Sequence, residues 1–237
     1  MGRRSYFVSD LHLFSRRSQA AEHAEALQGA AARAKTFVLG GDIFDFRWST
    51  LESTQATVEA AIHWLDELVG SHRNCDFHFV LGNHDCNARF VAALEKYARK
   101  MPNLVAHPYL LRIGRSVFLH GDVVDHPQMC ATRLSHRRKH WSRDERRRGA
   151  VKNMLYDWAV QARLHQLCGK MVHPKKRVAR RILGYLDRIG QGAESGTENV
   201  YFGHTHQSLS GYRHNEVAFH NPGAPIAGLD FRIVEVA

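Results

Sequence analysis

Over the first hundred residues, short runs of apolar, β-branched and aromatic residues alternate with longer segments of helical periodicity. The short runs end in polar clusters and predict strands over residues 6–8, 36–39 and 77–81. The longer segments predict helices over residues 18–34, 53–69 and 87–100. This alternation predicts a sheet with parallel strands, whose functional residues gather in the loops beyond the carboxyl ends of the strands.

After Pro102 the pattern becomes one of short strands. A two-residue turn, Gly114-Arg115, separates the strand-like residues 110–113 and 116–119 and predicts a hairpin. Further strands are predicted near the carboxyl end, over residues 199–202, 208–212, 216–219 and 231–236. We therefore expect a second, largely antiparallel sheet.

Strand patterns are missing between residues 122 and 198, where apolar residues recur at helical spacing instead. One expected helix contains Val151, Met154, Leu155, Trp158 and Ala162. A second one follows Pro174 and contains Val178, Ile182, Leu186 and Ile189. The sequence thus predicts an α/β domain made of residues 1–124 and 197–237, interrupted by a basic helical insertion, residues 125–196, that forms a lid or cap.

The charge of the chain is concentrated in this insertion. With 237 residues and a net charge of +10, the composition fits a soluble globular protein and excludes a disordered polyanion. Residues 125–195 hold 17 Lys and Arg against 6 Asp and Glu, whereas the remaining residues are close to neutral. Such runs are commonly solvated helix faces, but they can also bind a phosphorylated headgroup, an anionic membrane surface or, less favoured here, nucleic acid.

The cysteines and the amino terminus give no sign of secretion. Cys75, Cys86, Cys130 and Cys168 form no C-x-x-C pair, so neither a disulfide framework nor a zinc site is indicated. No apolar segment near the start is long enough for a signal peptide or a membrane span. We expect a cytoplasmic protein that contacts the inner face of a membrane through its basic insertion.

Each of five predicted strand ends carries side chains that can bind a metal. The five clusters are Asp10-Leu11-His12, Gly41-Asp42-Ile43-Phe44-Asp45, Gly82-Asn83-His84-Asp85, His120-Gly121-Asp122 and Gly203-His204-Thr205-His206. Carboxylate, amide and imidazole donors suit Mn²⁺, Fe²⁺ or Zn²⁺, and the lack of thiolates argues against a structural zinc site. In extended backbone, alternate residues point the same way, so D-x-H and H-x-H can each offer two ligands to one cavity.

In this order, the motifs D-x-H, G-D-x-x-D, G-N-H-D, H-G-D and G-H-T-H resemble those of the calcineurin-like metallophosphoesterase superfamily. The resemblance spans residues 10–206 and implies a four-layer α/β/β/α sandwich with two divalent metal ions, Mn²⁺ being favoured over Fe or Zn. It implies that one metal is held by Asp10, His12, Asp42 and His206. It implies that the other is held by Asp42, Asn83, His120 and His204, so that Asp42 bridges the two.

The same resemblance implies roles in catalysis for residues near the metals. His84 matches the histidine that contacts the phosphate and protonates the leaving oxygen, and we expect Asp85 to orient it. Asp45 and Asp122 are expected to hydrogen-bond ligating histidines, with loop capping as the alternative. With Asn83, the neighbouring Arg47 and Trp48 are candidates for substrate binding, although surface packing explains the last two equally well.

Within the superfamily, S-D-L-H-L, G-D-I-F-D, H-G-D and the helical insertion before G-H-T-H resemble the UDP-2,3-diacylglucosamine pyrophosphohydrolase group of lipid A synthesis. This resemblance implies hydrolysis of the pyrophosphate to UMP and a lipid phosphate, with the insertion as a lid over acyl chains. His84 is a departure, because the well-studied branch of that group has arginine there. The alternatives are a general phosphodiesterase or nucleotide phosphatase, and a non-catalytic scaffold that binds partners or nucleic acid through the insertion.

Overall fold

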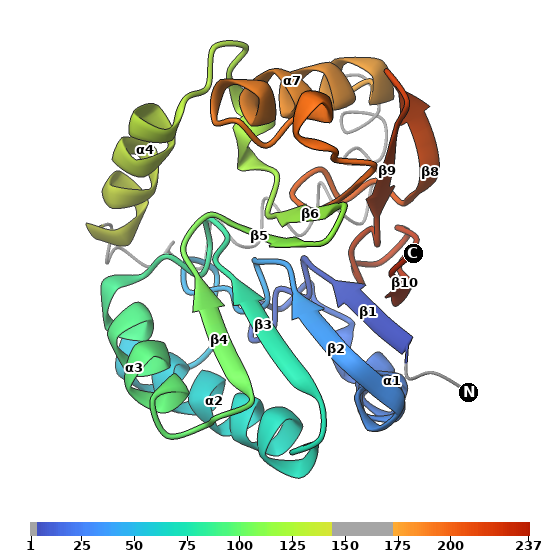
Figure 1. Ribbon diagram of the computed structural model, residues 1–237. Helices are drawn as coiled ribbons and strands as arrows, with labels where there is room; N and C mark the ends of the chain where they lie inside the picture. Colours follow the sequence, from blue (N-terminus) through green and yellow to red (C-terminus); the bar gives the residue numbers. More distant parts are fainter. Residues whose placement is uncertain (1–3, 144–172) are drawn as a thin grey trace.

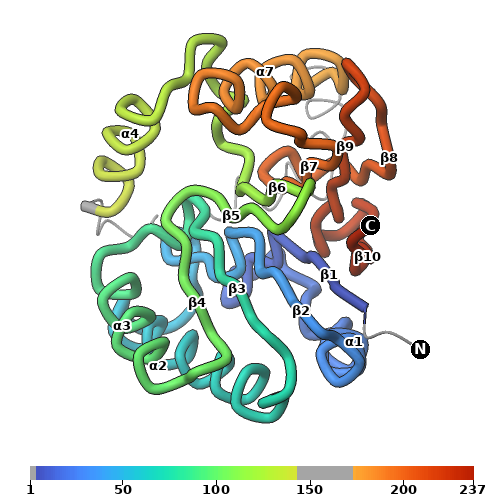
Figure 2. The backbone as a smooth tube through the Cα atoms, viewed as in Figure 1, coloured from blue at the N-terminus to red at the C-terminus, as the bar shows by residue number. Residues whose placement is uncertain are grey.

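A computed structural model describes residues 4–143 and 173–237 and shows a sandwich of four layers (Figure 1). Helices α1, α2 and α3 cover one sheet, a second sheet packs on its other face, and helix α7 covers the second sheet. This confirms the predicted α/β/β/α architecture. The amino-terminal strand pairs with the carboxyl-terminal one, so both ends of the chain lie at the same side of the molecule (Figure 2).

The first sheet has the order β10-β1-β2-β3-β4. Its strands are β1 (Arg4–Val8), β2 (Ala34–Leu39), β3 (Asp76–Val80), β4 (Leu104–His107) and β10 (Val234–Glu235). Strands β1 to β4 are parallel, as the alternation of strands and helices predicts, and β10 is antiparallel to β1. The carboxyl ends of β1, β2 and β3 therefore lie at one edge of the sheet.

The helices that cover this sheet begin and end close to the predicted residues. They are η1 (Ala20–His23), α1 (Ala24–Arg33), α2 (Thr54–Leu65) with its π-helical extension η2 (Asp66–Gly70), and α3 (Ala88–Ala98). Ser53 accepts a hydrogen bond from the Ala56 amide at the start of α2, and Asn87 accepts from the Arg89 amide at the start of α3. These short polar side chains satisfy amide groups that a helix leaves free at its first turn.

The second sheet has the order β5-β6-β7-β9-β8. Its strands are β5 (Leu110–Ile113), β6 (Ser116–Leu119), β7 (Asn199–Phe202), β8 (Leu209–His214) and β9 (Val217–Asn221). The hairpin of β5 and β6 is confirmed. The expectation of a largely antiparallel sheet is wrong, because β7 runs parallel to both β6 and β9. A connection of 79 residues, from 120 to 198, separates β6 from β7 and leaves ample chain to return for a parallel pair.

Two further strands differ from expectation. The last predicted strand, residues 231–236, is only the two-residue β10, and it joins the first sheet rather than the second. Strand β4 is not among the predicted strands. Its burial shows no period of two, because one buried residue is followed by an exposed one and two half-buried ones.

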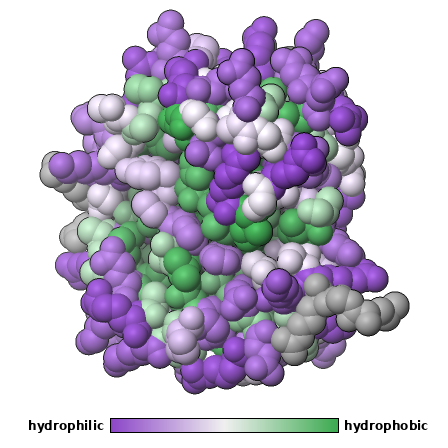
Figure 3. All heavy atoms as spheres, viewed as in Figure 1, coloured by the Kyte–Doolittle hydropathy of each residue, from purple (hydrophilic) through white to green (hydrophobic). Residues whose placement is uncertain are grey.

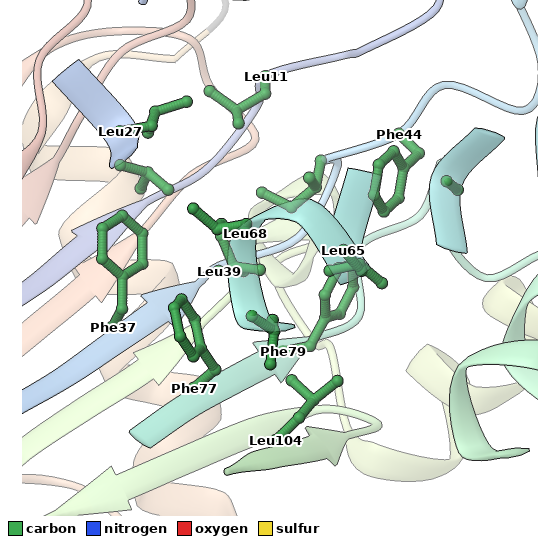
Figure 4. Close-up of a cluster of buried hydrophobic side chains, with 14 of the residues drawn as sticks. Leu11, Leu27, Phe37, Leu39, Phe44, Leu65, Leu68, Phe77, Phe79 and Leu104 are labelled. Atoms are coloured by element: carbon green, nitrogen blue, oxygen red, sulfur yellow. The ribbon is translucent and has the colours of Figure 1, made fainter. Parts of the chain in front are cut away.

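Three apolar clusters separate the four layers. Beneath the first sheet, phenylalanines of β2 and β3 pack on leucines of the helices (Figure 4). Phe7, Phe118 and Tyr201 fill the space between the two sheets, with the Phe118 and Tyr201 rings stacked at 4.8 Å. On the outer face of the second sheet, Phe202 and Phe219 pack against Ile182 and Leu186 of α7.

Two described helices belong to the predicted insertion. Helix α4 (Ala131–Arg143) follows the short helix η3 (Asp122–Asp125), and α7 (Lys175–Arg188) precedes the turn η4 (Ala193–Ser195). Helix α7 confirms the helix expected after Pro174, and it forms the outer layer of the sandwich. The other expected helix, around Val151 to Ala162, lies outside the described residues. The proposed domain boundaries stay a prediction.

On the face shown in Figure 3, hydrophilic side chains border the upper rim, and hydrophobic residues are visible across the middle. Among the described helices, none has the length and apolar character needed to cross a bilayer.

Candidate dinuclear metal centre

The five motifs predicted to bear ligands meet at one place, where the two sheets face each other. Three of them follow the parallel strands β1, β2 and β3, and two follow β6 and β7, which are parallel to each other. Because the strands of each set end at the same edge, residues far apart in the sequence become neighbours. Asp10 and His206 are 196 positions apart, yet their side chains lie 3.4 Å from each other.

The first group of donors consists of Asp10, His12 and His206, whose ligand atoms all lie within 4.8 Å of one another. Nε2 of His12 is 3.1 Å from Nε2 of His206 and 4.0 Å from Oδ2 of Asp42. Asp10 is fully buried, and its carboxylate accepts hydrogen bonds from the Ser9 hydroxyl and the His204 amide. Lone-pair donors converging from two sheets form a site that fits a divalent cation.

The second group consists of Asp42, His120 and His204, again within 4.8 Å of one another, together with Asn83. Nε2 of His120 is 3.2 Å from Oδ2 of Asp42 and 3.1 Å from Oδ1 of Asn83. Nδ1 of His204 lies 3.1 Å from the same amide oxygen. Asp42 therefore lies between the two groups, in the position that the resemblance assigns to a bridging ligand.

Hydrogen bonds on the far side of the imidazole rings turn the correct nitrogen toward the centre. Nδ1 of His12 faces Oδ2 of Asp45 at 3.3 Å, and Nδ1 of His120 faces the carbonyl oxygen of Gly40 at 3.3 Å. A ring whose Nδ1 carries the hydrogen presents a lone pair at Nε2. His204 is reversed, since its Nε2 lies 2.8 Å from Oδ1 of Asp125 and its Nδ1 faces the centre.

Five of the candidate ligands have left-handed backbone, which non-glycine residues rarely adopt. Their φ angles are 54° for Asp10, 46° for His12, 52° for Asp42, 66° for His204 and 55° for His206. Strain of this kind persists only where the surrounding structure enforces it, and it clusters at functional sites. The turn after each strand thus aims the side chain at the centre at the expense of local stability.

Two glycines allow the backbone to pass directly beside the buried carboxylates. A Cβ atom on Gly82 would lie 2.2 Å from Oδ1 of Asp42, and one on Gly203 would lie 2.1 Å from Oδ2 of Asp10. Both distances are far below van der Waals contact, so any side chain at these positions would displace a candidate ligand. The glycines of G-N-H-D and G-H-T-H therefore contribute to the site by being small.

The electrostatics of the centre favour charged carboxylates. Burial alone would raise the pKa of Asp42, but His120 and His84 lower it well below its ordinary value. For Asp10, burial likewise raises the pKa, while the hydrogen bond to and charge of His206 bring it below the usual range. Burial lowers the pKa of His206, although its hydrogen bond to Asp10 and the charge of that carboxylate oppose the effect.

His84 lies beside the donor groups, and its backbone amide donates to Oδ1 of Asp42 at 2.7 Å. Its ring packs edge-on against His12 with the ring centres 4.9 Å apart. Burial lowers the pKa of this imidazole, but the charges of Asp45 and Asp42 outweigh that effect and raise it to about 9. The ring therefore carries a proton at neutral pH, as a proton donor requires. His84 also belongs to a third set of converging donors, with His12 and Asp42.

The expected contact between Asp85 and His84 is replaced by another one. Asp85 is fully buried and points away from His84, with Oδ1 accepting from the Phe44 amide at 2.9 Å and Oδ2 accepting from the Gly82 amide at 3.3 Å. Its role is to tie the loop after β3 to the loop after β2. It is Asp45 that orients His84, because its Oδ1 lies 3.0 Å from Nδ1 of His84. Burial and the nearby charge of Asp42 raise the pKa of Asp85 to about 7.

Asp122 also differs from expectation, since its partner is an arginine rather than a ligating histidine. Its two oxygens accept hydrogen bonds from Nε and Nη2 of Arg138 at 2.9 and 2.7 Å. Burial raises the pKa of Asp122, but the guanidinium of Arg138 lowers it to about 2. The carboxylate is thus charged throughout the physiological range.

Arg47 and Trp48 lie at the rim of the centre. Their backbone amides donate to Oδ1 of Asp45 at 3.1 and 2.8 Å, so Asp45 also caps this loop. The guanidinium of Arg47 lies 4.4 Å from the ring centre of Trp141, and that of Arg17 lies 4.5 Å from the ring centre of Trp48. Arg47 thus faces the insertion, whereas Trp48 packs against the amino-terminal part of the chain. Their part in substrate binding stays a prediction.

Three residues of the insertion reach the centre, and the sequence analysis assigns no role to them. Asp125 contacts His204, Arg138 pairs with Asp122, and the ring of Trp141 lies 5.5 Å from that of His84. The sequence gives one indication of the role of Asp125. It follows Asp122 of the H-G-D motif by three residues, so in a helical turn the two side chains lie on the same side. The docking of Trp141 and Arg138 depends on tertiary structure and has no local signal.

A four-layer sandwich with two adjacent groups of carboxylate, amide and imidazole donors at its strand ends is the architecture of metal-dependent phosphoester hydrolases. The chain belongs to the calcineurin-like phosphoesterase family, whose profile matches residues 3–208. Members of this family use a dinuclear metal centre, and the donor groups described above fit one. The enzyme class predicted from the motifs is thereby confirmed, which argues against a non-catalytic scaffold.

The solved structures that this chain matches share little sequence with it. A nuclease, MPE, from Pseudomonas putida is 13% identical over 99% of this chain and 88% of its own, with a TM-score of 0.40. A dimetal phosphatase from Danio rerio is 12% identical over 94% and 87%, with a TM-score of 0.48. A putative 5'-nucleotidase from Staphylococcus aureus is 12% identical over 98% of this chain and 52% of its own, with a TM-score of 0.39. No curated protein sequence gives a significant match.

Proposed function

We propose that this phosphohydrolase cleaves the pyrophosphate bond of a nucleotide-sugar lipid such as UDP-2,3-diacylglucosamine, giving UMP and a lipid phosphate. The observation that carries the proposal is the place of helix α4. This helix of the insertion lies beside His84 and brings Trp141 to within 5.5 Å of its ring. A basic and aromatic wall at the catalytic histidine favours a substrate that is large and anionic beyond the scissile phosphate.

The residues of the centre divide the chemical work between them. Asp10, His12, Asp42 and His206 would hold one divalent metal, and Asp42, Asn83, His120 and His204 would hold the other. When bound, two such ions activate water and offset the charge that develops on the phosphoryl oxygens. His84 would donate its proton to the leaving oxygen, and Asp45 holds its ring in place for that step.

The donor set favours Mn²⁺, with Fe and Zn as the alternatives, because it contains oxygen and imidazole donors and no thiolate. Cys86 lies nearby, but its thiol donates to the carbonyl oxygens of Asn83 and Arg138. Burial raises the pKa of this thiol to about 12, so it stays protonated and does not compete as a ligand.

The basic face of α7 supports contact with an anionic membrane that holds such a lipid. Its inner face packs on the second sheet, while Lys175, Lys176 and Arg180 on its outer side are exposed. Each basic residue near an anionic surface contributes roughly 1 kcal/mol of attraction. The second basic run of the insertion, Arg146 to Arg148, lies outside the described residues.

A general phosphodiesterase or nucleotide phosphatase activity is the second candidate, and His84 favours it. The well-studied branch of the lipid hydrolases has arginine at this position, whereas a related branch and many general phosphoesterases keep the histidine of G-N-H-D. The same centre would then act on a smaller ester, with α4 selecting among nucleotides rather than lipids.

The deciding experiment is a product-release assay with the purified protein and Mn²⁺. We expect UMP from UDP-2,3-diacylglucosamine, and loss of at least about 100-fold in kcat/KM for Asp42→Ala and His84→Ala, since each removes a group used in the reaction. Bis-p-nitrophenyl phosphate, cyclic nucleotides and single-stranded DNA are run in parallel. Turnover of these esters without release of UMP would transfer the assignment to the second candidate, and no metal-dependent turnover at all would refute both.

A further inference from the structure

Arg138 is an unusual residue for the helix that carries it. Helix α4 is strongly basic and mostly exposed, yet the side chain of Arg138 is only 7% exposed. Nε and Nη2 form a two-pronged contact with Asp122, and Nη1 donates to the carbonyl oxygen of Pro108 at 2.5 Å. Burying an arginine is favourable only when its donors are satisfied in this way. The solvated face that we expect for the basic residues of the insertion does not include Arg138.

The same residue joins helix α4 to a second loop of the centre. Its backbone carbonyl accepts a hydrogen bond from Sγ of Cys86 at 3.4 Å, and this thiol also donates to the carbonyl oxygen of Asn83 at 3.1 Å. Asp122 follows the candidate ligand His120 by two residues. Arg138 is therefore bonded to two of the loops that carry candidate ligands.

The neighbours of Arg138 on the helix face the centre. Trp141, three residues on, lies beside His84 and under the guanidinium of Arg47. Arg137 donates to Oδ2 of Asp125 at 2.8 Å, and Oδ1 of the same carboxylate contacts His204. This contact is more exposed than the one made by Arg138, with 41% of the Arg137 side chain accessible, so it stabilises the helix less.

We propose that Arg138 is the positioning residue that fixes helix α4 against the metal centre, and that it sets substrate selectivity by holding Trp141 beside His84. The inference rests on the proposed hydrolase function. The hydrogen bonds described for the Arg138 side chain go to Asp122 and Pro108 rather than to a candidate ligand, so it acts through Trp141. The group it selects is the bulky part of the ester beyond the phosphate, which would lie against the Trp141 ring beside His84.

Arginine is needed at this position because of geometry. Its planar guanidinium matches both oxygens of Asp122 and still reaches Pro108, whereas a lysine has a single charged nitrogen. Removing one partner leaves a buried charge without compensation, so the variant Arg138→Met is best accompanied by the double variant Asp122→Leu/Arg138→Met. The double variant removes the anchor without leaving that charge.

Cys86 offers a measurement of the anchor that does not depend on catalysis. The thiol is buried where α4 meets the loop after β3, so release of the helix exposes it. We expect the rate of N-ethylmaleimide labelling at Cys86, followed by peptide mapping, to rise about tenfold or more in Arg138→Met and in the double variant. Labelling at Cys75, buried elsewhere in the fold, is the internal control for general unfolding, and Arg133→Met on the exposed part of α4 is the matched variant.

Selectivity is tested with two p-nitrophenyl diesters of phosphate, one bearing a methyl group and one bearing thymidine through its 5' oxygen. In Arg138→Met, kcat/KM for the thymidine ester should fall about tenfold further than kcat/KM for the methyl ester, mainly through KM. Trp141→Ala should show the same change, and combining it with Arg138→Met should add little, because both act through one group. Arg138→Lys should lie between the wild type and Arg138→Met.

The proposal would be overturned by unchanged labelling of Cys86, by equal loss on both esters, or by additive effects of the Arg138 and Trp141 substitutions. Labelling of Cys86 and Cys75 to the same extent would show general unfolding and also count against a local anchor. If the wild type hydrolyses neither ester, the phosphodiesterase candidate fails, and the labelling rate of Cys86 alone decides whether Arg138 anchors the helix.

Discussion

Nδ1 of His84 lies 3.0 Å from Oδ1 of Asp45, a residue 39 positions earlier in the chain. The other oxygen of Asp45 faces Nδ1 of His12 at 3.3 Å. One buried carboxylate thus orients both a candidate metal ligand and the proposed proton donor. Because Asp45 lies on the loop after β2, its position ties the protonation of His84 to the geometry of the centre.

Replacing Asp45 by asparagine should shift the fall of kcat/KM at alkaline pH to lower pH. Burial lowers the pKa of His84, while Asp45 and Asp42 raise it to about 9. The protonated ring is the active form of a proton donor, so activity falls as pH rises through this pKa. Without the charge of Asp45 the pKa falls, and we expect the fall of kcat/KM to shift down by about one pH unit or more.

The measurement is kcat/KM against pH for an ester with a poor leaving group, in the wild type and in Asp45→Asn. An ester of p-nitrophenol serves as the control, because its leaving oxygen needs little protonation and its profile should respond less. If kcat/KM fell at the same alkaline pH in both proteins, Asp45 would not set the pKa of His84.

Replacing Gly82 by alanine should disable the centre while leaving the fold intact. The new Cβ would lie 2.2 Å from Oδ1 and 2.4 Å from the amide nitrogen of Asp42, so the loops after β2 and β3 must separate. We expect loss of bound metal and a fall of about 100-fold in kcat/KM, since small displacements of catalytic groups have effects of this size.

Gly184→Ala is the matched control for this substitution. Gly184 lies within α7, and its Cβ would meet only the far end of Arg188, at 3.7 Å. Alanine should stabilise the helix there by roughly 0.5–1 kcal/mol. Full metal content in Gly82→Ala, measured by elemental analysis, would contradict the close approach described above.

The sequence predicts the centre well because its geometry follows from topology. Parallel strands end at one edge, so motifs that follow β1, β2 and β3 must meet, whereas His120 and His204 are assigned from the family resemblance because the parallel pairing of β6 with β7 is not expected from the sequence. No side-chain detail is needed for that conclusion. The order of elements predicts two sheets, and the family resemblance supplies their arrangement as a four-layer sandwich.

Contacts between loops are less predictable, and Asp85 shows why. Adjacency to His84 in the sequence favours a role as its partner, but the turn sends the two side chains in different directions. Asp85 points inward to the amides of Phe44 and Gly82, whereas Asp45 approaches His84 from another strand. Likewise, the basic pattern of α4 gives no sign that one of its arginines, Arg138, is buried.

Asn83→Ala should reduce the metal content from two ions to one. The amide oxygen lies 3.1 Å from both His120 and His204, so it belongs to one donor group only. The Asp10, His12 and His206 group keeps its three donors. We expect the affinity of the second ion to fall by about tenfold or more, and the increase in Tm on adding Mn²⁺ to become smaller than in the wild type.

Metal content by elemental analysis and Tm against Mn²⁺ concentration are the measurements. His206→Ala is the complementary variant and should weaken the other site. If Asn83→Ala retained two tightly bound ions, the amide would not be a ligand, and its proximity to both histidines would reflect hydrogen bonding alone.

Reversing exposed charges on α7 should weaken binding to anionic vesicles if the insertion meets a membrane. Lys175, Lys176 and Arg180 lie on its outer side, and their combined change to glutamate removes roughly 3 kcal/mol of attraction, or about 100-fold in partitioning. The matched control reverses the same number of exposed charges on or next to α3, at Lys96, Arg99 and Lys100. Both proteins change net charge equally, so a difference between them reports the location of the contact.

Sedimentation with vesicles containing phosphatidylglycerol, at two salt concentrations, measures the binding of each protein. Equal partitioning of the two variants would remove α7 from the membrane contact, and no salt dependence in the wild type would show that its binding is not electrostatic.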